Sequence, residues 1–146
     1  MPLTIPSGEV THVIQLAIAP VFLLTAVCTL INVLINRLGR AVDRRSVLNA
    51  RIGGLEGPPR ESASAELDVL GRRFRLIYGA IFLAVLAALL ICLLIALAFI
   101  DALIAADLST MVAILFILAM LALIGSLGAF LREIFLGVNT VRCPIV

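Results

Sequence analysis

Three long runs of apolar residues constrain this chain more than any other feature of its sequence. They extend from about Val13 to Asn36, from Leu76 to Ile100 and from Met111 to Leu131. A helix needs about 20 residues, at about 1.5 Å each, to cross a hydrocarbon core of about 30 Å. The hydrophobic fraction of 63% also exceeds that of soluble domains, which is roughly half. The sequence therefore predicts an all-α membrane protein with three transmembrane helices, forming a single membrane domain over residues 1–146.

The positive charges are distributed unevenly about these runs. All eleven basic residues are arginines; nine lie between the first and second runs and two follow the third. No arginine precedes the first run or separates the second from the third. Because loops rich in Lys and Arg stay on the cytoplasmic side, we expect an inner-membrane protein with its N-terminus outside and its C-terminus in the cytoplasm.

The first two helices are expected to continue beyond the membrane. Helical spacing of apolar residues persists after Asn36 as far as Gly53 and Gly54, where the helix should end. The Gly-, Pro- and Ser-rich segment that follows is typical of a turn, and a new helix is expected to begin near Ser62 or Ser64. Residues 37–75 are therefore predicted to form a cytoplasmic helical hairpin, which is too small and too charged to be an independent enzyme domain.

A row of polar residues interrupts the first apolar run along one side. At about 100° per residue these six side chains fall within about a quarter of the helical circumference. We call them the polar face of the first helix: Thr25, Thr29, Asn32, Asn36, Arg40 and Asp43. Polar groups in hydrocarbon are costly unless they have partners, so this face is the leading candidate site.

The polar face has two interpretations. In the first, several copies of the chain surround an axis, and Thr25, Thr29 and Asn32 offer uncharged oxygens to a water-filled path. Asn36, Arg40 and Asp43 would then form its cytoplasmic mouth. In the second, the same residues hydrogen-bond to neighbouring helices and conduct nothing, each bond contributing on the order of 1 kcal/mol.

The arginines of the predicted hairpin also have two interpretations. They bind anionic lipid headgroups at the cytoplasmic mouth or pair with counter-charges from Asp43 and Glu66, or they only set the topology. The residues in question are Arg44, Arg45, Arg72, Arg73 and Arg75.

The sequence carries no recognisable catalytic or cofactor-binding pattern. It lacks Ser/His/Asp and Cys/His sets, HExxH and phosphate-binding glycine loops, and its apolar runs contain no acidic or basic residue. His12, Cys28, Cys92 and Cys143 are too dispersed for a metal site. We expect no enzyme activity, no metal, no cofactor and no nucleic-acid partner.

Several stretches together resemble a known bacterial family, the domain of unknown function 2721. They are LAIAPVFLLTAVCTLINVLINRLGRAVDRRSVL, ELDVLGRRFRLIYGAIFL and FLREIFL. The matching features are APVFLL, the pattern of Asn32, Asn36 and Arg37, and the pairs Asp43-Arg44, Arg72-Arg73 and Arg132-Glu133. The resemblance covers nearly the whole chain and implies a small three-span protein of the bacterial inner membrane. It implies no mechanism and no catalytic residues.

Three small helices leave little core in which to hide a polar face. We therefore expect a homo-oligomer in the lipid bilayer, with the first helix lining an ion-conducting pore or channel. The competing hypothesis is a non-catalytic scaffold or accessory subunit whose polar face binds another membrane protein. A holin-like, lesion-forming protein is a third possibility with the same topology.

Overall fold

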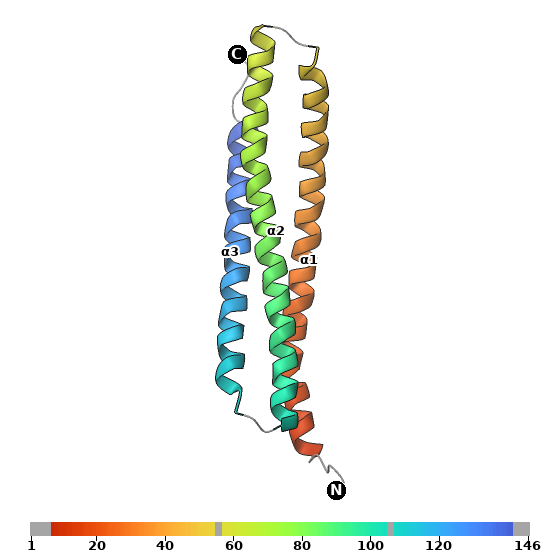
Figure 1. Ribbon diagram of the computed structural model, residues 1–146, viewed down its shortest axis with the longest axis vertical. Coiled ribbons are helices and arrows are strands. Elements are labelled where there is room, and N and C mark those ends of the chain that lie inside the picture. The colour runs from red at the N-terminus through yellow and green to blue at the C-terminus, as the bar shows by residue number, and fades with distance from the viewer. Residues whose placement is uncertain (1–6, 55–56, 105–106, 142–146) are drawn as a thin grey trace. The chain divides into compact units, whose positions relative to one another are not determined.

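Three long helices make up the part of the chain that the structure describes. The computed structural model describes residues 7–54, 57–104 and 107–141. These residues form α1 (Ser7–Ile52), α2 (Pro58–Ile104) and α3 (Ser109–Val141), without any strand among them (Figure 1). Each helix is long and apolar enough to cross a membrane, over Ile14–Ile52, Glu61–Ile104 and Ser109–Gly137. The predicted all-α fold, with three helices long and apolar enough to span a membrane, is confirmed.

The turn between α1 and α2 is shorter than the sequence suggested. As predicted, α1 ends at Ile52, just before Gly53 and Gly54. However, α2 begins at Pro58 rather than near Ser62 or Ser64. Proline suits the first turn of a helix because its fixed φ is already helical and its missing N–H has no partner there in any case.

Ser62 and Ser64 lie inside α2 and do not cap it; their hydroxyls bond to backbone carbonyls of the preceding turn. The Ser62 hydroxyl donates to the carbonyl of Pro58 at 3.2 Å, and that of Ser64 to the carbonyl of Glu61 at 2.8 Å. Gly57, immediately before α2, has φ +77°, a left-handed conformation that glycine adopts without steric cost.

The chain forms two compact units, each containing parts of all three helices. The first comprises Met1–Leu30 and Leu83–Ile124, and the second comprises Ile31–Phe82 and Gly125–Val146. In the first unit the buried side chains are Val27, Ala84, Ala87, Ile91, Leu94, Ala119 and Ala122. In the second they are Leu34, Leu70, Ile77, Ala80, Ser126 and Glu133.

Small residues bring α2 and α3 together in the second unit. Ala80 and Ser126 are both fully buried, and the Ser126 hydroxyl donates to the carbonyl of Ala80 at 2.7 Å. Small side chains let helix backbones approach closely, and a hydroxyl can then bond across the contact. This bond anchors α3 against α2 within the same unit as the charged cluster described below.

Two acidic residues, Asp101 near the end of α2 and Asp107 just before α3, bond to groups at the start of α3. In the first unit Asp101 Oδ1 accepts the backbone N–H of Leu108 at 3.0 Å, and Asp107 Oδ1 accepts the Ser109 hydroxyl at 2.9 Å. Since α3 begins at Ser109, these carboxylates satisfy donors beside the helix start.

Candidate functional site

The N-terminal part of the polar face, Thr25 and Thr29, lies opposite the core of the first unit. At about 100° per residue, Thr25 and Thr29 lie about 160–200° around α1 from the buried Val27. Both threonines are exposed. Their hydroxyls bond within α1, from Thr25 to the carbonyl of Val21 at 3.2 Å and from Thr29 to the carbonyl of Thr25 at 3.0 Å. These two residues therefore need no second helix to satisfy their donors.

The asparagines of the polar face differ from the threonines. In the second unit Asn32 and Asn36 lie about 160–200° around α1 from Leu34, whose side chain is fully buried. Both are exposed, and neither side-chain amide bonds to another residue that the structure describes. The next positions on the face, Arg40 and Asp43, are also exposed and form no ion pair with described residues. The chain's own described helices thus leave the polar face uncovered.

The predicted headgroup arginines fall into separate groups. Arg44 and Arg73 line the same pocket in the second unit. The guanidinium carbon of Arg45 lies 5.9 Å from the centroid of the Phe74 ring, which is a cation–π contact. Arg72 and Arg75 are exposed and do not line this pocket. The pocket therefore brings together two of these five side chains, Arg44 and Arg73.

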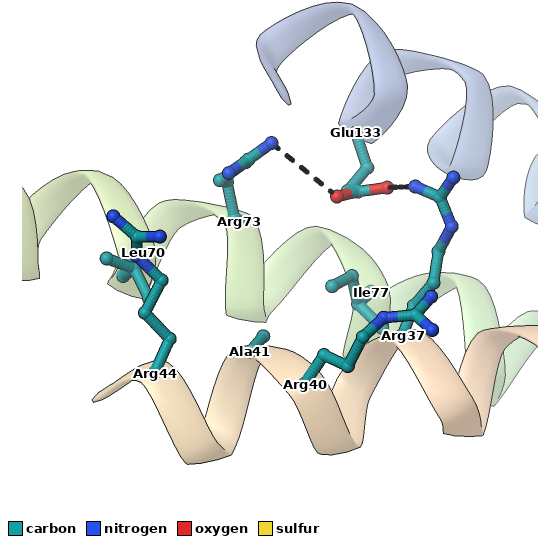
Figure 2. A pocket seen from close by; sticks show the side chains of 8 residues that line it. All are labelled: Arg37, Arg40, Ala41, Arg44, Leu70, Arg73, Ile77 and Glu133. Atoms are coloured by element: carbon teal, nitrogen blue, oxygen red, sulfur yellow. Dashed lines mark hydrogen bonds and ion pairs between the residues drawn. The ribbon is translucent and has the colours of Figure 1, made fainter. Parts of the chain in front are cut away.

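A buried carboxylate links all three helices of the second unit. Glu133 on α3 is only 6% exposed. Arg37 Nη1 on α1 lies 2.7 Å from Glu133 Oε2, and Arg73 Nη2 on α2 lies 3.9 Å from Glu133 Oε1. Figure 2 shows the two guanidinium groups approaching the carboxylate from opposite sides. Glu133 is therefore a shared counter-ion for one arginine of each neighbouring helix.

Sequence reasoning missed this role of Glu133. The residue lies just past the predicted third run, and it was noted only as part of a family pattern. A signal was present, because Ala119, Ala122, Ser126 and Glu133 are spaced to lie on one side of a helix. All four are buried. A lone acidic side chain on the small-residue face of an apolar helix should have been expected to pair with arginine.

Two further contacts position the arginines. The guanidinium carbon of Arg37 lies 5.0 Å from the centroid of the Phe130 ring. Gly137 on α3 leaves room for Arg73, since a Cβ at this glycine would collide with Arg73 Nη2. The Nε of Arg73 is buried and has no hydrogen-bond partner among the described residues. Arg37 thus has a hydrogen-bonded counter-ion and a ring contact, whereas Arg73 has only a long ion pair and a buried Nε without a partner.

A pocket of about 350 Å³ opens beside this cluster. Its lining comes from α1, α2 and α3 (Figure 2), and comprises Arg37, Arg40, Ala41, Arg44, Leu70, Arg73, Ile77 and Glu133. Four arginines against one carboxylate give a formal charge of +3. Arg44 also pairs with Glu66 at 2.9 Å, on an exposed part of the surface. The pocket remains electropositive after both carboxylates are counted.

The described residues contain no group of three or more His, Cys, Asp or Glu side chains that could hold a metal ion. Cys28 and Cys92 are free and exposed. Cys143 and Arg142 lie outside the described residues.

The sequence matches one family along most of its length. The family is described as a protein of unknown function (DUF2721), and the match covers residues 17–143. No curated protein and no solved structure matches the chain. The matched region contains the polar face, Glu133 and the arginine-lined pocket.

Proposed function

We propose that this chain, which belongs to the DUF2721 family of proteins of unknown function, assembles in the membrane as a homo-oligomer through the polar face of α1. One observation carries the proposal. Asn32 and Asn36 expose their amides on the side of α1 opposite Leu34, within a helix apolar enough to span a membrane.

An uncovered amide is expensive in hydrocarbon. A polar group without a hydrogen-bond partner in an apolar environment costs about 2–7 kcal/mol, depending on the reference state. Thr25 and Thr29 avoid this cost by bonding to the backbone of α1. The side-chain amides of Asn32 and Asn36 do not bond to any described residue, so contact with another polypeptide or with water would stabilise them.

A second copy of the chain suits this face by its chemistry. Each asparagine amide carries both donors and an acceptor, so the same residue on an identical helix can satisfy it. Arg40 and Asp43 carry opposite charges and are unpaired among the described residues. Arg40 of one copy can therefore pair with Asp43 of another.

Assembly around an axis would form a path for small ions. Thr25, Thr29 and Asn32 would supply uncharged oxygens to it, and Asn36, Arg40 and Asp43 would form its mouth. Towards the N-terminus the same side of α1 continues with Phe22 and Ile18, which are 73% and 49% exposed. These apolar side chains would narrow the path and close it by dewetting.

Mass and flux measurements test the two parts of this proposal. Protein extracted in mild detergent should run as a multiple of 15.5 kDa, and liposomes containing it should show ion flux. Asn32→Leu should lower the mass or change the flux. Asn49→Leu is the matched control, because Asn49 is exposed on α1 but lies beyond the apolar run and off the polar face. Co-purification with a different chain in place of self-association would show an accessory subunit and overturn the proposal.

The proposed orientation follows from the arginines. We place the turn between α1 and α2 and the C-terminal end of α3 in the cytoplasm, and the protein in a bacterial inner membrane. Cysteine introduced at Ser46 should resist membrane-impermeant maleimide in intact cells, whereas cysteine at Ser109 should react once the outer membrane is permeabilised. The reverse labelling pattern would contradict this orientation.

A further inference from the structure

We propose that the arginine-lined pocket of the second unit binds a phosphate group. Three of its arginines, Arg40, Arg44 and Arg73, have donor capacity that Glu133 does not use. Arg40 forms no ion pair with a described residue, and among described residues Arg44 pairs only with the half-buried Glu66. The inference does not rest on the proposed oligomer.

Arg73 provides the strongest argument for a ligand. Its only described carboxylate contact is 3.9 Å long, and its buried Nε has no hydrogen-bond partner among described residues. A buried donor without a partner costs about 1–3 kcal/mol. An anion in the adjoining pocket would accept from this guanidinium.

The geometry favours phosphate over a single carboxylate. Arginine presents a planar set of N–H donors that matches phosphate and carboxylate oxygens in bidentate fashion. Arginines approach the pocket from both α1 and α2 (Figure 2). A tetrahedral group with several free oxygens can meet donors from two helices at once. Glu133 lines the pocket. Its carboxylate holds Arg37 and Arg73 at the edge of the pocket and leaves the pocket volume free for a ligand.

The level of the pocket along the helices suits a lipid headgroup. Arg37 is the first charged residue after the apolar part of α1, and Glu133 follows the apolar part of α3 by two positions. Phosphates of phospholipids lie at the same boundary between hydrocarbon and water. Ala41, Leu70 and Ile77 add apolar lining to the pocket. A free phosphate compound offers the same group, so the experiment separates the two sources.

Isothermal titration calorimetry of the full-length protein in a neutral maltoside detergent measures the binding affinity of the site. The probes are short-chain phosphatidylglycerol in one arm and inorganic phosphate in the other. Arg40→Gln and Arg44→Gln should each weaken binding by about tenfold, the effect expected when one charge-assisted hydrogen bond is lost. Arg40 belongs both to the pocket and to the polar face, so Arg40→Gln alone does not separate phosphate binding from oligomer formation. Arg44→Gln changes the pocket without changing the polar face. Circular dichroism confirms that each variant is helical.

Arg72→Gln is the matched control, since it removes the same charge from an exposed site outside the pocket. Its effect should stay below about twofold, because solvent and salt screen exposed charges. Pocket-dependent binding of the lipid alone identifies a headgroup site, binding of phosphate alone a soluble ligand, and binding of both the phosphate group itself. Absence of binding in both arms overturns the proposal. An equal loss in Arg72→Gln also overturns it, because only the net charge would then matter.

Discussion

Arg37 and Glu133, which are 96 positions apart, form a 2.7 Å ion pair that joins α1 to α3 in the second unit. The Glu133 side chain is 8% exposed, whereas the Arg37 side chain is 34% exposed and lies against Phe130. The pair therefore has one buried member and one member near solvent. Removing the buried member should be the more damaging change, because it leaves Arg37 and Arg73 facing each other without a counter-ion.

Glu133→Gln should lower the free energy of unfolding by about 2 kcal/mol, because the amide cannot neutralise two arginines. Denaturation in mixed micelles, followed by circular dichroism, measures the change. Glu66→Gln is the matched control, because its pair with Arg44 is exposed and should be worth less than about 0.5 kcal/mol. A double-mutant cycle with Arg37→Gln should give a coupling of about 1–3 kcal/mol. Equal effects of the two Glu substitutions would contradict a structural role for Glu133.

Ser126→Ala should destabilise the contact between α2 and α3. The variant removes the 2.7 Å bond to the carbonyl of Ala80, which is worth about 1 kcal/mol between membrane helices. Ser46→Ala, at an exposed position of α1, should change the unfolding free energy by less than about 0.5 kcal/mol. The same micelle titration compares them, and a neutral Ser126→Ala would show that packing alone holds these helices together.

Gly137→Ala should affect the pocket more than the fold. The new methyl group would occupy the space of Arg73 Nη2, and the flexible arginine can rotate away from it. We expect the unfolding free energy to change by less than about 1 kcal/mol. The higher helix propensity of alanine, worth about 1 kcal/mol over glycine, offsets the cost of moving Arg73. Phosphate binding should weaken by about three- to tenfold as Arg73 leaves its position.

Gly128→Ala serves as the control for this substitution. It lies on the same helix, and an added Cβ there would meet nothing within 4 Å. Titration with phosphate should show unchanged affinity for this variant. If both alanine variants bind phosphate equally well, the position of Arg73 does not matter for the site.

Asp101→Ala should loosen the turn between α2 and α3 in the first unit. The backbone N–H of Leu108 would lose its acceptor, at a cost of about 1 kcal/mol. Hydrogen exchange at Leu108 should speed up, while Asp107→Ala, which affects only an exposed contact with Ser109, should leave that amide unchanged. Unchanged protection in Asp101→Ala would show that water replaces the carboxylate without loss.

The fold was predictable because hydrophobicity and helix-ending residues act locally. The apolar runs specified three spans, and Gly53 and Gly54 marked the end of α1. The start of α2 was placed too late because the capping preference of serine was weighted above the preference of proline for a first turn. Both preferences act locally, and in the structure α2 begins at Pro58 rather than at a serine.

The charged cluster was harder to predict, because it depends on contacts between residues far apart in the sequence. Arg37, Arg73 and Glu133 come from three helices, and single-helix patterns do not show which arginine a carboxylate selects. The polar face was identified because its residues share one helix. The proposed cover of that face is a second copy of the chain, which no contact within a single copy reveals, so it stays a prediction.

Cysteine cross-linking between copies tests the central claim most directly. In a background with Cys28, Cys92 and Cys143 replaced by alanine, single cysteines are placed at Asn32, Asn36 and, as a control, Ile35. Ile35 is 50% exposed and lies about 100° around α1 from Asn36, off the polar face. Oxidation of native membranes should give a disulfide-linked dimer of this chain at Asn32 or Asn36 and little at Ile35. Equal cross-linking at all three positions, or none at either asparagine, would contradict association through the polar face of α1.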